Sequence, residues 1–386
     1  MNAPLFAQPI RSAMSSSRDP DVAARELADT LVHSELGFVL FFCSAEYDLE
    51  ALSLSLEAAF DGIRLAGCTT AGELTPRGYD QGTITALGFD RNLFAIEVGL
   101  VEALDDFSLT QAQTLIDGLV AGCRDLHVAP TKGHTFALTL LDGLSSQEEL
   151  VLLNLDSVLG SIPHFGGSAG DDIHLTGTHV YHAGQFRTRA AVVIMVNTPL
   201  DFEVFTTHHM RSLEQKLIVT DADPATRTVY ELNAEPAALE YARQLGLDPD
   251  QLDYRVFALN PLAVRIGQEY YVRSIQKVNP DLSLTFYCAV ENGIVLTAMQ
   301  PDAMLDNLAH RFERIEQTLG EPMITIGCDC FLRRLEAEYT RRTDETSDFL
   351  VKHNVIGFNT YGEQYDGMHL NQTFTGVVIG RSAHDY

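Results

Sequence analysis

A glycine motif that recurs with a fixed spacing is the sequence feature that most restricts the fold. The segments GCTTAGE at 67–73 and GFNTYGE at 357–363 share Gly, Thr, Gly and Glu in register. A Thr-x-Thr sequence then begins at the same offset from each motif, at Thr83 and at Thr373. Because unrelated segments rarely share several spaced identities, we predict an internal repeat.

The same order of strand-like and helical segments surrounds each copy of this motif. A strand-like run, a helix, the glycine motif and further strands follow one another over 38–100, and this order returns over 134–207 and 323–379. GGSAGD at 166–171 is the middle copy and is one residue tighter. The chain is therefore expected to use a strand, helix, glycine-turn, strand unit at least three times.

Two interpretations of the glycine motifs stay open at this point. The motifs are tight turns between strands, because glycine adopts positive φ and allows close backbone approach at no steric cost. Alternatively, their backbone N–H groups, with Glu73, Asp171 or Glu363, face a cavity shared by the units. Neither motif is a phosphate loop, since no Gly-Lys-Ser/Thr follows.

The alternation of strands and helices predicts an α+β or α/β fold, in which layered mixed β-sheets are covered by helices. The region between the second and third units differs, because it reads as a helix over 233–246, capped by Asn233, followed by antiparallel strands. We expect a loose N-terminal arm over 1–24, a first domain over 25–215 and a second domain over 216–386.

The charge of the chain restricts its partners. Lys and Arg number 26 against 53 Asp and Glu, so the net charge is −27. Such a chain repels phosphate groups, which excludes nucleic acid and anionic membrane surfaces as partners. Its apolar runs fall short of the roughly 20 residues of a membrane span, and no stretch reads as a signal peptide. We expect a reduced, cytoplasmic protein without membrane insertion.

Five segments together resemble the FIST sensory proteins, in which a FIST N domain precedes a FIST C domain. The segments are GCTTAGEL at 67, FGGSAGDD at 165, VYELNAEPAALEYA at 229, NPLAVRIGQEYYVRSI at 260 and NTYGEQYDG at 359. Their order along the chain extends the resemblance from the segment after the N-terminal arm to the C-terminus.

Within this family the chain is most similar to the nitric-oxide-sensing NosP haemoproteins. That resemblance implies a non-covalent b-type haem, nitric oxide as the ligand, and regulation of a separate histidine kinase or of a cyclic-di-GMP enzyme, a diguanylate cyclase or phosphodiesterase. The family also implies an alternative, a haem-free sensor of an amino acid or another carboxylate. A homodimer is the default assembly.

A haem iron needs an axial ligand, and His208 and His209 stand out among the 13 histidines. In the strand-like run DFEVFTTHHM they lie on opposite faces, and His208 shares its face with more apolar neighbours. His164 is a further candidate, because the adjacent Gly166 and Gly167 let a flat ligand approach the backbone. The alternative for each is an ordinary buried or capping histidine. Nine others have no distinguishing feature: His33, His127, His134, His174, His179, His182, His353, His369 and His384.

Arg265 and Arg273, with Tyr271 between them, are candidates to bind a carboxylate. An Arg guanidinium offers a bidentate fork that suits a haem propionate or the carboxylate of an amino acid. A salt bridge to one of the many acidic residues is an equally good interpretation of either arginine.

Catalytic signatures are few in the sequence. It has no His-Glu-x-x-His and no local cysteine-protease signature, so we expect a sensor and not an enzyme. Cys328 and Cys330 form one close pair, whereas structural zinc usually needs two pairs. A third hypothesis, an enzyme on the same scaffold, predicts a nucleophile and a base within hydrogen-bond reach.

Overall fold

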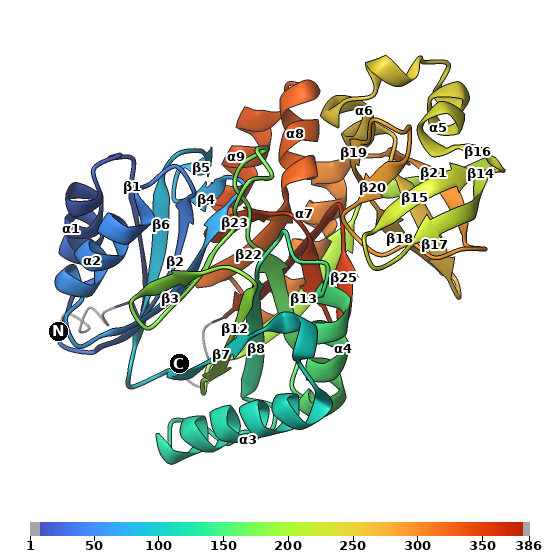
Figure 1. The fold of residues 1–386 in the computed structure, drawn as a ribbon. Coiled ribbons are helices and arrows are strands. Elements are labelled where there is room, and N and C mark those ends of the chain that lie inside the picture. The colour runs from blue at the N-terminus through green and yellow to red at the C-terminus, as the bar shows by residue number, and fades with distance from the viewer. Residues whose placement is uncertain (1–7, 381–386) are drawn as a thin grey trace.

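The computed structural model describes residues 8–380 and shows three similar α/β units with one additional β-sheet inserted into the third (Figure 1). The first unit comprises β1 (Ile10–Ser15), α1 (Pro20–Leu31), β2 (Leu36–Ser44), α2 (Leu49–Ala59), β3 (Arg64–Thr70), β4 (Glu73–Thr75), β5 (Gly78–Asp80) and β6 (Ile84–Asp90). The second comprises β7 (Ala95–Glu102), η1 (Leu104–Asp106), α3 (Leu109–Asp125), β8 (Thr135–Leu141), α4 (Glu148–Leu159), β9 (His164–Ser168), β10 (Val180–His182), β11 (Gln185–Arg187) and β12 (Ala190–Asn197).

The third unit is interrupted by the inserted sheet. It comprises β13 (Phe202–His208), α7 (Met304–Leu319), β22 (Ile324–Cys330), α8 (Phe331–Tyr339), α9 (Thr343–Lys352), β23 (Val355–Thr360), β24 (Glu363–Tyr365), β25 (Met368–Leu370) and β26 (Thr373–Ile379). The insertion comprises β14 (Met210–Asp223), β15 (Thr228–Leu232), β16 (Glu235–Pro236), α5 (Ala237–Leu245), η2 (Pro249–Gln251), α6 (Tyr254–Leu259), β17 (Leu262–Ile266), β18 (Glu269–Arg273), β19 (Ile275–Val278), β20 (Leu284–Phe286) and β21 (Val295–Pro301).

The three units share one strand order and exchange hairpins in a cycle. Their sheets run β1-β6-β2-β3-β10-β11, β7-β12-β8-β9-β24-β25 and β13-β26-β22-β23-β4-β5. In each sheet the third and fourth strands are parallel and joined through helices, as a crossover connection requires. The last hairpin of each sheet belongs to another unit, so the second unit completes the first sheet, the third completes the second, and the first completes the third. The predicted repeat is confirmed.

The inner faces of the three sheets meet in one apolar core, and helices cover the outer faces. In that core Phe42 of the first unit stacks on Phe358 of the third, with ring centroids 4.6 Å apart. Separate clusters lie under α1 and α2 and under α3 and α4. This arrangement is the layered mixed α+β fold that the alternating pattern predicts.

The inserted sheet has its own strand order and core. Its order is β18-β17-β21-β14-β15-β20-β19, with β16 paired to β15. Met210 and Pro301, where the insertion begins and ends, are cross-strand neighbours. The predicted helix is present as α5, and Gly246 ends it in the left-handed conformation. Asn233 does not cap it, because α5 begins four residues later and the Asn233 amide donates to Glu240 instead.

Two further segments differ from the sequence expectations. Within the expected arm over 1–24, β1 pairs antiparallel with β6 and α1 begins at Pro20, capped by Asp19; residues 1–7 lie outside the described residues. The single helix expected over 331–351 is two helices, α8 and α9, separated at Arg341, whose φ is 59°. The expected boundary between residues 215 and 216 stays a prediction, and it falls within β14.

Candidate functional site

The three glycine turns meet where the units meet, and they bond to one another through the main chain. Ala71 N donates to Asn359 O at 2.9 Å, and Asn359 N donates to Gly72 O at 2.7 Å. Ser168 N donates to Gly362 O at 2.8 Å, and Gly170 N donates to Thr69 O at 3.0 Å, which closes the cycle. The turns therefore hold the units together through main-chain hydrogen bonds.

The recurring Glu and Thr of the motif have the same structural role in the first and third units. Glu363 is fully buried and accepts hydrogen bonds from the Thr360 hydroxyl, from Thr373 N at 3.0 Å and from Thr373 Oγ1 at 2.8 Å. Glu73 accepts from the corresponding groups of Thr70 and Thr83. Burial raises the pKa of each carboxyl to about 7, although these hydrogen bonds lower it.

In the middle unit Asp171 caps a turn, accepting from the backbone N–H groups of Leu175, Thr176 and Gly177. Its carboxylate also accepts from the Tyr361 hydroxyl, so it ties the middle turn to the third unit. Gly72 and Glu73 of the first turn also line a pocket of about 110 Å³, together with Asp172 of the second unit. Packing and hydrogen bonding account for the glycines themselves.

His209 is enclosed and both of its ring nitrogens are engaged. Its side chain is fully buried, with Nε2 2.7 Å from a Glu336 carboxylate oxygen and Nδ1 2.8 Å from Arg333 Nη1. Arg333 is itself paired with the buried Asp329. An axial role for His209 requires that one of these contacts be broken.

His208 and His164 differ in what their ring nitrogens contact. His208 is half-buried and accepts from Met210 N at Nδ1, and within residues 8–380 no hydrogen-bond partner of its Nε2 is found. His164 lies in the core, with Nε2 2.6 Å from Thr139 Oγ1 and Nδ1 without a partner among the described residues. Burial lowers the pKa of both imidazoles, to about 4 for His164, so both are neutral at pH 7.

Gly166 and Gly167 are close-packed and leave no room for a flat ligand. A Cβ at Gly166 would lie 2.1 Å from the Thr139 carbonyl oxygen, and one at Gly167 would lie 2.5 Å from Thr360 Cγ2. They serve the approach of neighbouring strands, which is the structural reason for glycine here.

Arg265, Tyr271 and Arg273 lie on the β17–β18 hairpin of the inserted sheet. Arg265 is exposed and donates to Gln268, with its guanidinium over the Tyr270 ring. Arg273 donates to the Val272 carbonyl, and the described residues give neither arginine a salt bridge. The structure does not bring these three residues together with His164.

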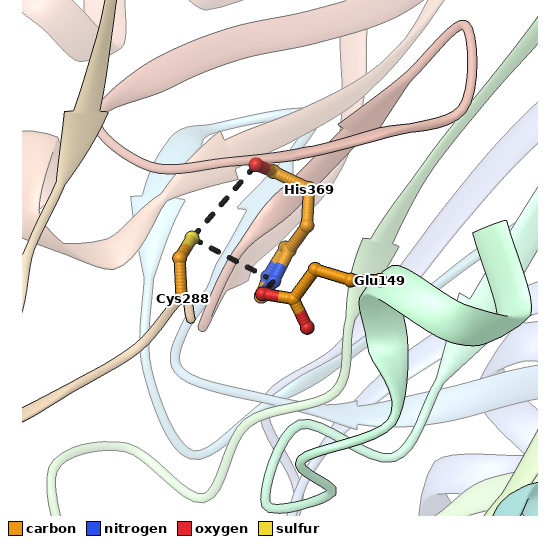
Figure 2. A group of neighbouring side chains, drawn as sticks. All are labelled: Glu149, Cys288 and His369. Atoms are coloured by element: carbon orange, nitrogen blue, oxygen red, sulfur yellow. Dashed lines mark hydrogen bonds and ion pairs between the residues drawn. The ribbon is translucent and has the colours of Figure 1, made fainter. Parts of the chain in front are cut away.

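Another convergence of chemically active side chains lies at the junction of the inserted sheet with the second and third units. We call Glu149, Cys288 and His369 the junction site (Figure 2). Glu149 lies in the first turn of α4, Cys288 in the loop after β20, and His369 in β25. The Cys288 sulfur lies 3.6 Å from His369 Nδ1, and Glu149 Oε1 lies 3.5 Å from the same nitrogen.

Neighbouring groups fix the Glu149 carboxylate in place. The Ala289 backbone N–H donates to Oε1 at 2.8 Å, and Arg227 Nη2 donates to Oε2 at 2.5 Å. Arg227 also pairs with Glu148 at 2.6 Å. Burial opposes ionisation of Glu149, but the His369 hydrogen bond and charge, with Arg227, hold its pKa well below its usual range.

His369 is buried between the other two members of the site. Burial disfavours the imidazolium, yet the charge of Cys288 and hydrogen bonds to Cys288 and Glu149 raise the pKa of His369 above its usual value. Its Nε2 is buried without a partner among the described residues, directly against Gly362 of the third glycine turn.

The junction site meets the criterion of the third hypothesis only in part. Cys288 and His369 are a thiol and a base within hydrogen-bond reach. A nucleophile–base pair also needs a group that orients the base from its other nitrogen, whereas Glu149 contacts the same Nδ1 as the thiol. The geometry instead brings one sulfur, one nitrogen and one oxygen atom within 4.8 Å of one another.

Sequence reasoning missed this site. It set His369 aside as an ordinary histidine and gave no role to Cys288 or Glu149, because three residues so far apart carry no spacing signal. Cys328 and Cys330, which it considered, are both buried on β22 but lie in two different apolar clusters. Strand alternation alone would put them on one face, but Cys330 is the last residue of the strand, directly before α8.

No helix within residues 8–380 is both long and apolar enough to cross a lipid bilayer. No curated protein matches the chain. The family model of the FIST N domain matches residues 37–235, more than half of the chain, and that of the FIST C domain matches residues 237–366. The matched regions contain all three glycine motifs and the inserted sheet, and the chain therefore belongs to the FIST family of sensory proteins.

Proposed function

We propose that the chain is a sensor whose small ligand binds at the junction site and whose bound state is passed to a separate signalling enzyme. FIST domains indicate sensing of small ligands in signalling. We place the ligand at this site because Glu149, Cys288 and His369 come together there from three separate parts of the fold. A ligand there changes how the inserted sheet, α4 and β25 contact one another.

The ligand class that these groups suit is an amino acid or a related small carboxylate. The carboxylate of Glu149 complements an ammonium group, and its side chain is 36 % exposed, so the site opens toward solvent. His369 supplies the positive charge that a carboxylate needs, because Arg227 is already paired with Glu148 and Glu149. This proposal is the haem-free alternative of the sequence analysis, with the ligand site at the junction site and not at Arg273.

Thermal unfolding of the purified protein against the proteinogenic amino acids and small dicarboxylates tests this proposal. A ligand at about 100 times its Kd stabilises the folded state by about 2.7 kcal/mol. The shift is expected to disappear in Glu149→Gln and to persist in Glu148→Gln, which keeps an acceptor for Arg227. A panel without any shift, or a shift unchanged in Glu149→Gln, would overturn the proposal.

The signalling partner is proposed to be a histidine kinase or a cyclic-di-GMP enzyme. The measurement is co-purification with the kinase, followed by its autophosphorylation rate with and without the bound sensor ligand. Identical rates in both states, with the complex intact, would contradict this part of the proposal.

Haem binding with a response to nitric oxide is a second proposal, and His208 is the observation that favours it. Its free Nε2 suits an axial ligand. The surroundings do not fit a b-type haem as they stand, because the charged groups of Glu269 and Arg333 lie near the ring and neither His208 nor His209 lines the principal pockets of the described residues.

The absorption spectrum after haem reconstitution tests this second proposal. It would be recorded for the wild type, His208→Ala and His209→Ala, each with and without nitric oxide. A Soret band that is lost only in His208→Ala and shifted by nitric oxide would support it. A spectrum equal to that of free haem would exclude it.

A further inference from the structure

We infer that the junction site binds one divalent transition-metal ion of the zinc type through Cys288 Sγ, His369 Nδ1 and a Glu149 carboxylate oxygen. The inference rests on the proposed function, because it names the ion through which a ligand is held at the same site. Thiolate, imidazole and carboxylate are the donor types that proteins use for zinc.

Two of the three distances between the donor atoms match those around a tetrahedral ion. Sγ lies 3.6 Å from Nδ1, Nδ1 lies 3.5 Å from Glu149 Oε1, and all three atoms lie within 4.8 Å of one another. With bonds of about 2.3 Å to sulfur and about 2.1 Å to nitrogen and oxygen, tetrahedral angles separate donor atoms by about 3.4–3.6 Å. An ion can therefore reach all three groups after only a small movement of Glu149.

Hydrogen bonds satisfy the Nδ1 of His369 less well than an ion does. Cys288 and Glu149 both face Nδ1 of His369, and one ring nitrogen carries at most one hydrogen. A single N–H is thus shared between two neighbours at long distances, whereas one ion bonds to all three atoms. No such conflict exists at His209, whose two nitrogens have separate partners.

Charge balance also favours a divalent ion. Binding releases the thiol proton, and any proton on Nδ1, to solvent. The thiolate and the Glu149 carboxylate then neutralise the two positive charges, which suits a site where Cys288 and His369 are almost completely buried. Arg227 keeps its own counter-ion, because it pairs with Glu148 as well.

The surrounding groups would orient the ligands as outer partners do in metal sites. Arg227 and the Ala289 N–H fix the Glu149 carboxylate. Three protein ligands leave a fourth tetrahedral position, as in zinc sites that bind exchangeable ligands. The exposed side is that of Glu149, so the fourth position is expected to face solvent and to hold the sensed carboxylate.

Titration of the chelator-treated full-length protein with Co²⁺, followed by displacement with Zn²⁺, tests the inference without any activity assay. A thiolate-to-cobalt charge-transfer band in the near ultraviolet is expected to saturate at one ion per chain and to disappear with Zn²⁺. Cys288→Ser is expected to abolish the band, and Glu149→Gln to weaken Zn²⁺ binding about tenfold or more. Glu148→Gln and Cys123→Ser, at a buried thiol on α3, serve as matched controls and should retain the band.

A measurement on the wild type guards against variants that fail to fold. Zn²⁺ is expected to slow alkylation of Cys288 selectively among the six buried thiols, as mapped by mass spectrometry. The absence of a band and of protection would overturn the metal site, and so would a band that persists in Cys288→Ser.

The two proposals can fail separately. A carboxylate that binds the metal-free protein in a Glu149-dependent way, while Co²⁺ does not bind, overturns the metal inference and leaves the proposed function. Zn²⁺ binding without any ligand in the panel confirms the metal site and overturns the proposed carboxylate function.

Discussion

The substitution Glu363→Gln should stabilise the protein at high pH and leave it nearly unchanged at low pH. Burial raises the pKa of this carboxyl to about 7 in the folded protein from an ordinary value of 4.5. Between these values the folded state holds a proton that the unfolded chain releases, so stability falls as the pH rises across this window. This loss of stability is absent below about pH 4.5 and complete above about pH 7.

The magnitude follows from the size of the shift. A difference of about 2.5 pH units at about 1.36 kcal/mol per unit gives a cost of about 3 kcal/mol above pH 7. A glutamine keeps the hydrogen bonds, because its oxygen accepts from Thr373 N and Oγ1 and its amide donates to Thr360 Oγ1, in the places of the two carboxyl oxygens. We expect a gain of about 3 kcal/mol at pH 8.5 and of less than about 1 kcal/mol at pH 5.

Urea unfolding followed by far-ultraviolet circular dichroism measures this difference, since the chain has no tryptophan for a fluorescence assay. Glu73→Gln, in the corresponding contacts of the first unit, should behave in the same way. The exposed Glu313→Gln on α7 is the matched control and should show no such pH dependence. A gain equal at both pH values, or a loss at both, would refute the reasoning.

Three further experiments test the packing of the fold. Gly357→Ala should lower the free energy of unfolding, measured by thermal unfolding, by more than about 4 kcal/mol, because its Cβ would lie 1.8 Å from a backbone oxygen of β22. The control Gly118→Ala on α3, whose Cβ would contact nothing within 4 Å, should raise the free energy of unfolding by about 0.5–1 kcal/mol. Arg333→Met should cost about 3–5 kcal/mol by leaving the buried Asp329 unpaired, and Asp329→Asn in the same chain should recover part of that loss. Replacing residues 211–300 by a short Gly/Ser linker should leave a cooperative unfolding transition, since the flanking residues are cross-strand neighbours; a chain without this transition would show that the three units depend on the insertion.

The repeat was predictable from the sequence because its cause is local. The spacing from Gly357 to Thr360, Glu363 and Thr373 encodes one hydrogen-bonded arrangement that does not depend on distant residues. The exchange of hairpins was not predictable, because strands as short as β24 carry no signal for the sheet that they join. The strand β1 was missed for a related reason, since its sequence IRSAMS has little apolar character and its pairing with β6 is long-range.

The candidate site was predictable to a much smaller extent. Period-two alternation gave His208 the more apolar face, whereas His209, which directly follows β13, is the more buried of the two. The difference arises because both faces of β13 are covered, one by the shared core and one by α7. The junction site depends on tertiary contacts between segments far apart in the chain, so sequence spacing could not indicate it.

The junction site and the meeting point of the three units are linked through one glycine. A Cβ at Gly362 would lie 2.0 Å from His369 Nε2, so the imidazole packs directly on this turn. The carbonyl of Gly362 accepts from Ser168 N of the second unit, and Tyr361 N donates back to Ser168 O at 3.1 Å. Close-packed turns have little free volume in which to absorb a displacement. If the proposed ligand or ion moves His369, we therefore expect the contact between the second and third units to move as well.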